Sequence, residues 1–253
     1  MAEVEFDLVA IVFAHARAQT LDEALEQILV ELPKHGLRTA AVIHTDRCTP
    51  PVRTVVQKWL DTGFVLGTID SKVPVRSPEH GETFNLARSS GLWFLDYLGV
   101  KAQWASFWDD DWLLADPARA VRALLLHMDV PYWKAAILFA WTPDGQINIR
   151  QHHCSPLFFR YQPYMHMHPK WHTHVPEELR MQEGEILGSY LLDRGAATVE
   201  ERLALYKECA RAGKCDAYTQ RLVQPPQLKT MAEVLKIWPS PEEFVAWQTT
   251  QRM

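Results

Sequence analysis

The sequence of 253 residues lacks several features that would point to a particular class of protein. Its four cysteines, at positions 48, 154, 209 and 215, include no Cys-x-x-Cys pair, which predicts reduced thiols and argues against a zinc site built on thiolates. The first apolar run, residues 8–14, is too short to cross a bilayer, and acidic residues precede it where a secretory signal carries basic ones. We therefore expect a cytoplasmic protein without a transmembrane segment.

An excess of positive charge is also absent. The chain has 26 Lys and Arg against 31 Asp and Glu, a formal net charge of −5, so it offers no global attraction to nucleic acid or to an anionic membrane. A nucleic-acid acceptor is possible through a local basic groove but gains no support from this charge. No glycine-rich phosphate loop follows the first apolar run, which counts against a nucleotidyltransferase.

Strand-like and helix-like segments alternate along the first half of the chain. Continuous apolar runs rich in β-branched residues predict strands buried on both faces, and periodic segments between them predict helices. The expected strands are residues 8–14, 39–44, 64–69 and 102–108, and the expected helices are residues 20–32, 52–60, 83–98 and 116–127. This alternation predicts an α/β fold with a mostly parallel, Rossmann-type sheet flanked by helices.

Less regular segments follow. Residues 133–141 and 146–152 resemble two strands joined by a Pro-Asp-Gly turn, and residues 71–82 resemble a loop that we expect to cover a ligand. The remainder is expected to be helical, with capping boxes that begin at Thr198, Thr230 and Ser240, in addition to one at Thr20. We expect a catalytic domain over residues 1–176 and a helical C-terminal extension over residues 177–253.

Three consecutive aspartates, Asp109, Asp110 and Asp111, end the strand predicted at residues 102–108. Carboxylates repel one another and are costly to dehydrate, so this group needs a positive partner such as a divalent cation. In an extended segment Asp109 and Asp111 share one face, and Asp110 faces the other way. The alternative is a solvated acidic turn or a helix N-terminus.

The order of motifs resembles glycosyltransferase family 2 of the GT-A fold. The resemblance spans residues 7–176 and rests on six short segments, each placed at a strand end, a helix or a loop. They are Ala14-His15-Ala16-Arg17, Asp46, Asn85-x-x-Arg88, Asp109-Asp110-Asp111, Leu157-Phe158-Phe159-Arg160 and Trp171-His172-Thr173-His174. The family implies a nucleotide-sugar donor, such as a UDP-sugar, held through Mn²⁺ or Mg²⁺.

The resemblance also implies roles for single residues. Asp111 is the expected direct metal ligand, and Asp109 binds the metal, its water shell or the ribose. His172 or His174 completes the metal site. A zinc site formed only by His166, His168, His172 and His174 is the rival interpretation.

Other residues are expected at the donor. Because open α/β sheets bind ligands at the carboxyl ends of their strands, His15, Arg17 and Asp46 should meet the aspartates there. Asp46 matches the acidic residue that binds the base or ribose, and Arg88 and Arg17 match the diphosphate charge. The alternatives are a helix cap for Asp46, a surface ion pair for Arg88, a merely solvated Arg17, a bracing role for Asn85 and a hydrogen bond from Asp110 to a neighbouring loop.

One departure from the family concerns the catalytic base. Inverting members carry an acidic base after the acceptor loop, and neither Asp144 nor Glu177 and Glu178 match it cleanly. The catalytic residues, the acceptor and the stereochemical outcome are therefore left open. A metal-dependent glycosyltransferase is the leading interpretation. A nucleotidyltransferase that acts on a nucleoside triphosphate, or a degenerate nucleotide-sugar-binding module, is the alternative.

Overall fold

The computed structural model describes residues 5–71, 81–168, 175–194, 199–200, 203, 207 and 225–251. The chain divides into two compact units, each discontinuous in sequence. Unit 1 comprises residues 1–111, 116–134 and 156–185, and unit 2 comprises residues 112–115, 135–155 and 186–253. The boundary expected at residue 176, between a catalytic domain and a C-terminal extension, stays a prediction.

Unit 1 is built on the predicted parallel sheet. Its strands are β1 (Glu5–Ala14), β2 (Thr39–Thr45), β3 (Val65–Asp70) and β4 (Lys101–Asp109), in the spatial order β3-β2-β1-β4. All three pairings are parallel. The last residues of β7 (Ile147–Arg160) add an antiparallel strand beside β4. The expectation of a mostly parallel sheet is therefore confirmed.

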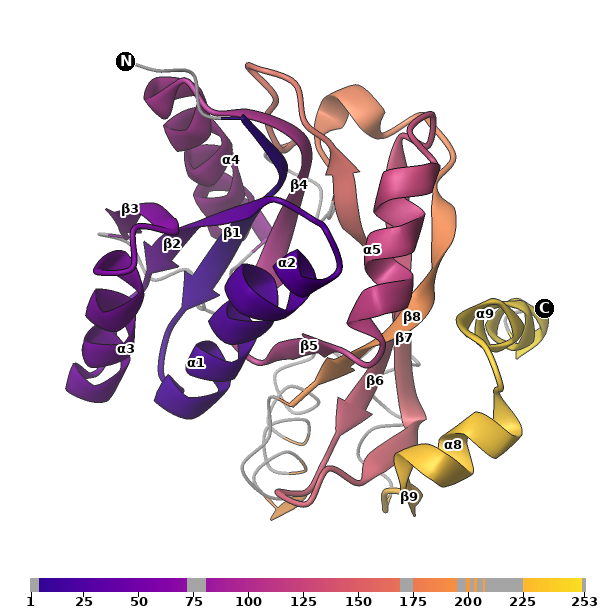
Figure 1. Cartoon of the computed structure of the whole chain (residues 1–253). Helices are drawn as coiled ribbons and strands as arrows, with labels where there is room; N and C mark the ends of the chain where they lie inside the picture. The colour runs from indigo at the N-terminus through magenta and orange to yellow at the C-terminus, as the bar shows by residue number, and fades with distance from the viewer. Residues whose placement is uncertain are drawn as a thin grey trace. The chain divides into compact units, whose positions relative to one another are not determined.

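Helices cover both faces of this sheet. α4 (Gly81–Leu98) lies on one face, and α1 (Ala18–Glu26) and α3 (Pro50–Leu60) lie on the other (Figure 1). Because side chains alternate along a strand, Val9 and Ile11 of β1 pack in one core cluster with Leu92 and Leu95 of α4. α5 (Pro117–Leu126) is the remaining long helix described in this unit, and the Asp116 side chain caps it by accepting from the backbone N–H of Arg119.

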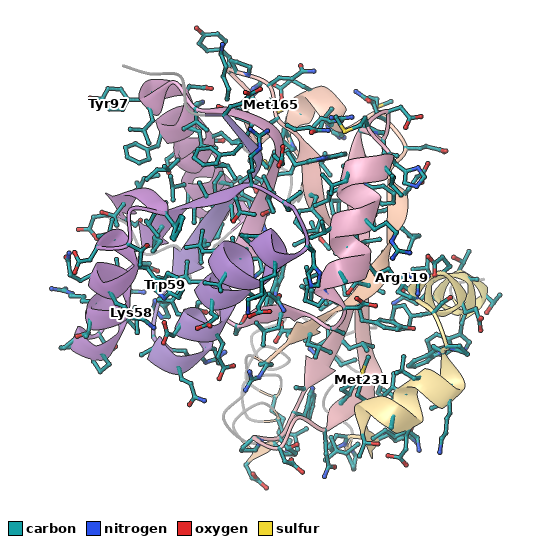
Figure 2. The ribbon with its side chains drawn as sticks, viewed as in Figure 1. Lys58, Trp59, Tyr97, Arg119, Met165 and Met231 are labelled. Atoms are coloured by element: carbon teal, nitrogen blue, oxygen red, sulfur yellow. The ribbon has the colours of Figure 1, made fainter. Side chains whose placement is uncertain are left out.

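Two contacts fix the helices of unit 1. On one face, Asp22 of α1 accepts hydrogen bonds from Lys58 and from the indole of Trp59 on α3, and Figure 2 shows these two side chains beside α1. On the other face, Gly91 lets α4 approach β1 closely. A Cβ atom at this position would lie 2.6 Å from a methyl carbon of Ile11.

The first helix differs from its prediction at both ends. It begins at Ala18 with Arg17 as N-cap, so the capping box expected at Thr20 does not form. It also continues past the expected stop, through a π-helical turn (Gln27–Glu31) into α2 (Leu32–Lys34), which contains Pro33. Proline lacks the N–H that an α-helix needs, and the wider π turn changes the hydrogen-bond register just before it.

Unit 2 holds strands that include antiparallel pairs. Its strands are β5 (Trp112–Leu114), most of β6 (Tyr132–Ala140), the first part of β7, β8 (Glu185–Asp193) and β9 (Leu228–Lys229). The order is β7-β6-β8-β5, with β9 paired to β7. The expectation that everything after residue 177 is helical is thus wrong for β8, whose backbone pairs with β5. β7 also extends eight residues beyond its predicted end at residue 152.

The helices of unit 2 whose bounds are described lie near the end of the chain. α8 (Met231–Ile237) begins with the predicted capping box between Thr230 and Glu233, and α9 (Pro241–Gln251) follows. Trp238 and Phe244 pack with Tyr190 of β8 in a second apolar core. The capping box expected at Thr198 lies outside the described residues, as does most of the loop expected at residues 71–82. Among the described helices, none is both long and apolar enough to span a bilayer.

Candidate functional site

The expected donor residues follow the carboxyl ends of three neighbouring strands of unit 1. Asp109 is the last residue of β4, His15 follows β1, and Asp46 follows β2. The strands are in register there, since Ala14 pairs with Thr45 and Phe13 pairs with Asp109. These strand ends therefore meet at one edge of the sheet, as predicted.

Hydrogen bonds join the three loops at this edge. The backbone N–H of His15 donates to Asp110 Oδ2 at 3.0 Å, and the backbone N–H of Asp46 donates to the carbonyl of Ala14 at 3.0 Å. His15 Nδ1 lies 2.9 Å from the carbonyl oxygen of Asp46. Because a carbonyl can only accept, Nδ1 carries the proton, and in the neutral ring Nε2 is left as an acceptor.

Asp110 forms the hydrogen bond to a neighbouring loop that was one of its two expected roles. Its side chain is buried, and the bond fixes the β1 loop against the end of β4. A contact between Asp110 and the donor stays a prediction.

Asp111 forms an ion pair with Arg17. One guanidinium nitrogen of Arg17 lies 2.5 Å from Asp111 Oδ2, and the two side chains are 36% and 7% exposed. β4 ends at Asp109, and residues 110–111 form a turn. The extended alternation that was expected to place Asp109 and Asp111 on one face therefore does not apply. Arg17 is nevertheless brought to the aspartates, and it is not merely solvated.

Asp109 has a different cationic neighbour, Arg88 of α4. Arg88 is only 1% exposed, so its interpretation as a surface ion pair is wrong. Burial lowers the pKa of the Arg88 guanidinium to about 9, and the charge of Asp109 opposes that change. The guanidinium carbon lies 5.3 Å from the ring centre of Phe107. Arg88 thus places positive charge beneath the end of β4, and its contact with a diphosphate stays a prediction.

Asn85, one turn before Arg88 on α4, braces the segment after β7. Its Nδ2 donates to the carbonyl of His168 at 2.7 Å, which is the bracing role given as its alternative. His166 pairs with Glu178 instead, at 2.8 Å. The remaining candidates, His172 and His174, lie outside the described residues. Within the described part of the chain, no group of three or more His, Cys, Asp or Glu side chains forms a candidate metal site.

The structure also describes the three residues that were considered as a catalytic base. Asp144 lies in the predicted tight turn, and hydrogen bonds from Thr142 and Gln146 lower its pKa. Glu177 and Glu178 begin a short 3₁₀ helix (Glu177–Leu179) in place of the expected longer helix. Asp144 therefore has a structural role in its turn.

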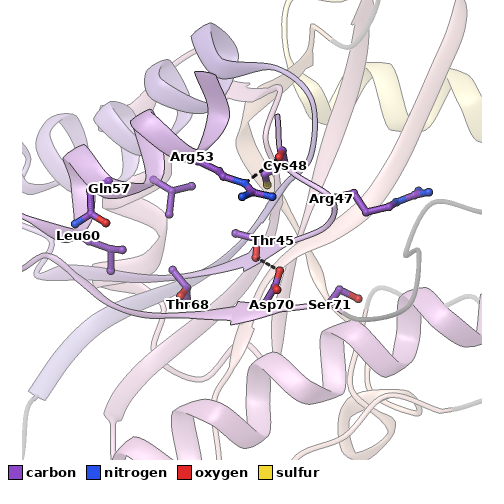
Figure 3. A pocket seen from close by; sticks show the side chains of 10 residues that line it. Thr45, Arg47, Cys48, Arg53, Gln57, Leu60, Thr68, Asp70 and Ser71 are labelled. Atoms are coloured by element: carbon purple, nitrogen blue, oxygen red, sulfur yellow. Dashed lines mark hydrogen bonds between the residues drawn. The ribbon is translucent and has the colours of Figure 1, made fainter. Parts of the chain in front are cut away.

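A cavity of about 510 Å³ lies beside the loop that carries Asp46 (Figure 3). It is lined by Thr45, Arg47, Cys48, Arg53, Val56, Gln57, Leu60, Thr68, Asp70 and Ser71. Arg53 Nε donates to the carbonyl of Cys48 at 3.1 Å, and the Thr45 hydroxyl lies 2.9 Å from Asp70. The cavity thus presents groups of both charges, with Val56 and Leu60 as its apolar part.

Sequence reasoning missed this cavity. Arg47 connects the cavity to the edge of the sheet that carries the expected donor residues. It lines the cavity, and its Nε lies 3.2 Å from Asp46 Oδ1. Its backbone has a positive φ of 48°. This conformation is uncommon for residues other than glycine, so the sequence does not predict it here. The positions of Thr45 and Asp70 in the sequence could have indicated it. They end neighbouring strands, at the edge where open α/β sheets bind ligands.

Comparison with known proteins gives no match to a family model and none to a curated protein. Among solved structures, the chain is similar to S. aureus TarS, with 15% identity over 86% of this chain and 42% of that one, and a TM-score of 0.38. A mannosyltransferase from Pyrobaculum calidifontis, in complex with GDP-Man and Mn²⁺, is 12% identical over 87% and 69% of the two chains, with a TM-score of 0.44. The chain covers 36% of the TarS 1–349 structure in complex with UDP-GlcNAc, at 14% identity and a TM-score of 0.34. It therefore spans less than half the length of the TarS chains.

Proposed function

We propose that this protein is a metal-dependent glycosyltransferase of the GT-A type that transfers a sugar from a nucleoside-diphosphate sugar to an acceptor. The observation that carries the proposal is the joined edge of the sheet. There Asp109, at the end of β4, and the two aspartates after it lie with His15, Arg17 and Asp46, which follow β1 and β2. Both carboxylates and cationic groups are available at this edge for an anionic, metal-bound donor.

The residues present fit a divalent cation. Carboxylate oxygens are preferred ligands of Mg²⁺ and suit Mn²⁺, and the buried Asp111 is already matched to a positive group. A cation of this kind is commonly held by one or two carboxylates together with substrate phosphates, so a cage of three protein ligands is not required. We assign Asp109 and Asp111 to the cation, with His172 or His174 as the further candidate. When bound, the cation stabilises the charge that develops on the leaving diphosphate.

The donor is proposed to lie across the ends of the parallel strands. Asp46 accepts hydrogen bonds from the ribose or base, and the cavity beside it provides room for the base. Arg17 supplies a guanidinium for the diphosphate. Arg88 acts from below by placing positive charge next to Asp109. Asp110 and His15 keep the β1 loop in place under the donor.

A panel of UDP- and GDP-sugars with Mn²⁺ tests the proposal. Release of a nucleoside diphosphate from one of them, dependent on Mn²⁺ and lost in an Asp109→Asn, Asp111→Asn double variant, is the expected result. The same samples are incubated with nucleoside triphosphates. Pyrophosphate release would instead indicate a nucleotidyltransferase, and nucleotide binding without any release would indicate a binding module.

A further inference from the structure

The ion pair between Arg17 and Asp111 joins an accessible cation to a buried carboxylate. The Arg17 side chain is 36% exposed, whereas the Asp111 side chain is 7% exposed. By contrast, the pair between Arg38 and Asp7 at the opposite end of β1 and β2 has side chains that are 59% and 16% exposed. A carboxylate as buried as Asp111, next to two other aspartates, is strongly destabilised without a positive partner.

Arg17 occupies one of the two carboxylate oxygens that Asp111 can offer to a divalent cation. The guanidinium lies 2.5 Å from Asp111 Oδ2, which is hydrogen-bond distance and leaves no room for a metal ion between the two groups. A cation that binds through this oxygen has to displace Arg17. The released guanidinium then needs another anion close by.

The position of Arg17 suits such an exchange. Its backbone is fixed as the N-cap of α1, where its carbonyl accepts the first helical hydrogen bond from Leu21 at 3.1 Å. Its partly exposed side chain is long and has several rotatable bonds, so it can move while the helix stays in place. The adjacent N-terminus of α1 also favours the negative charge of a diphosphate that the released guanidinium would contact.

We infer that Arg17 is an exchangeable counter-ion: it neutralises Asp111 in the ligand-free protein and passes to the diphosphate when a divalent cation takes Asp111. This inference rests on the proposed function. It makes binding of the cation and of the nucleotide mutually dependent. The cation alone has to break the ion pair without compensation, whereas the cation with a nucleoside diphosphate offers Arg17 a new partner.

The test measures Mn²⁺ and nucleotide affinities separately, without turnover. Free Mn²⁺ is followed by electron paramagnetic resonance in the full-length protein, alone and with UDP or GDP, and nucleotide affinity is measured by calorimetry with and without Mn²⁺. Arg17→Gln removes the charge and Arg17→Lys keeps it. Arg38→Gln is the matched control, because it breaks an arginine–aspartate pair at the other end of the sheet. Thermal melting establishes that each variant is folded.

Arg17→Gln is expected to bind Mn²⁺ alone at least about fivefold more tightly than the parent protein, as expected from the loss of a competing ion pair worth about 1 kcal/mol. The same variant should bind the nucleoside diphosphate less tightly in the presence of Mn²⁺, so the mutual dependence shrinks. Arg17→Lys should stay closer to the parent in both measurements. Arg38→Gln should leave both affinities unchanged.

Two unfavourable outcomes are distinguishable. Unchanged Mn²⁺ affinity in Arg17→Gln, in a protein that still binds Mn²⁺ with UDP or GDP, would overturn the counter-ion role and leave the proposed function intact. Failure of the parent protein to bind either nucleotide with Mn²⁺ would overturn the proposed function and this inference with it. An equal gain of Mn²⁺ affinity in Arg38→Gln would show a general effect of net charge and would also overturn the inference.

Discussion

Three chemically identical side chains at the end of β4 and directly after it have three different environments. Asp109 lies near the buried charge of Arg88, Asp110 accepts a backbone hydrogen bond from His15, and Asp111 pairs with Arg17. Each partner belongs to another segment of unit 1. A buried carboxylate without such a partner would cost several kcal/mol, so the triplet is kept in place by residues far away in the sequence.

The metal-ligand assignment is tested most directly at Asp111. Asp111→Asn keeps the size of the side chain but removes its charge, and we expect donor turnover to fall at least about a hundredfold. The fold should survive because Arg17 is partly exposed and can be solvated. Initial rates of nucleoside diphosphate release check this expectation. Asp61→Asn, an exposed aspartate at the end of α3, is the control. Parent-like rates in folded Asp111→Asn would contradict the assignment.

His44 should make stability depend on pH. Burial lowers the pKa of this imidazole below its ordinary value of 6.5, although the charges of Asp46 and Asp70 oppose the change. The unfolded chain therefore takes up a proton at a higher pH than the folded protein does, and stability is lost as the pH falls below about 6.5.

Replacing His44 by Phe should flatten this dependence. The centre of the His44 ring lies 5.5 Å from the centre of the Phe13 ring, so an aromatic side chain suits the site. Urea unfolding at pH 7.5, 6.5 and 5.5 would give the slopes for the parent and the variant. The same loss of stability in both proteins on acidification would show that another group is responsible.

At the scale of elements, the close approach of α4 to β1 depends on Gly91. Gly91→Ala would gain about 1 kcal/mol in helix propensity, but its methyl group would lie 2.6 Å from a carbon of Ile11, which is fully buried. We expect a net destabilisation of about 1–3 kcal/mol, because a packed core does not accept the extra atom without strain. Urea unfolding measures the change, with Ser90→Ala on the same helical turn as control. A more stable Gly91→Ala variant would contradict this close packing.

The cavity between α3 and the ends of β2 and β3 gives a second prediction at this scale. Thr68 lines it from the exposed edge strand β3, and a tryptophan there would fill much of its volume. We expect Thr68→Trp to weaken UDP or GDP binding about tenfold or more, if the base occupies this cavity as proposed. Thr54→Trp, on α3 outside the lining, is the matched control in calorimetry. Unchanged nucleotide affinity in Thr68→Trp would place the base elsewhere.

The elements that could be predicted from sequence are those with a strong local pattern. β1, β2 and β4 are buried on both faces and have continuous apolar runs, and α8 has a complete capping box. β8 was missed because Gly188 and Ser189 interrupt its pattern, and its strand geometry depends on pairing with β5. The stop expected at Pro33 failed because the π turn before it depends on backbone geometry that sequence does not show.

In the candidate site, too, some features could be predicted from the sequence and others could not. The order of strands and the position of the aspartates predicted which loops would meet. The contacts of His15 with Asp110 and Asp46, and of Arg17 with Asp111, follow that prediction. The individual pairings were beyond sequence reasoning, because they depend on side-chain directions in loops. The turn at residues 110–111 and the positive φ of Arg47 are two local conformations at this edge that the sequence pattern does not show.

At the scale of the whole molecule, each unit has its own apolar core. In unit 1 one apolar core cluster lies between α4 and the parallel sheet, and in unit 2 a cluster is formed around Tyr190, Trp238 and Phe244. The described residues that are proposed to bind the donor all belong to unit 1. Nucleotide binding should therefore depend on unit 1, and damage confined to the core of unit 2 should separate stability from donor affinity.

Trp238→Ala tests this separation. Trp238 is buried, its ring centre lies 5.1 Å from that of Phe244, and its carbonyl accepts a hydrogen bond from the Tyr190 hydroxyl at 2.9 Å. Removing the indole should lower the free energy of unfolding by about 3–5 kcal/mol, whereas the control Trp93→Ala, at a half-exposed position on α4, should change it by less than about 1 kcal/mol. Calorimetry at 10 °C, once circular dichroism has established that both variants are folded, should give UDP or GDP affinities with Mn²⁺ within about twofold of the parent, because the proposed donor residues of unit 1 are unaltered. A folded Trp238→Ala variant that no longer binds nucleotide would show that unit 2 takes part in holding the donor.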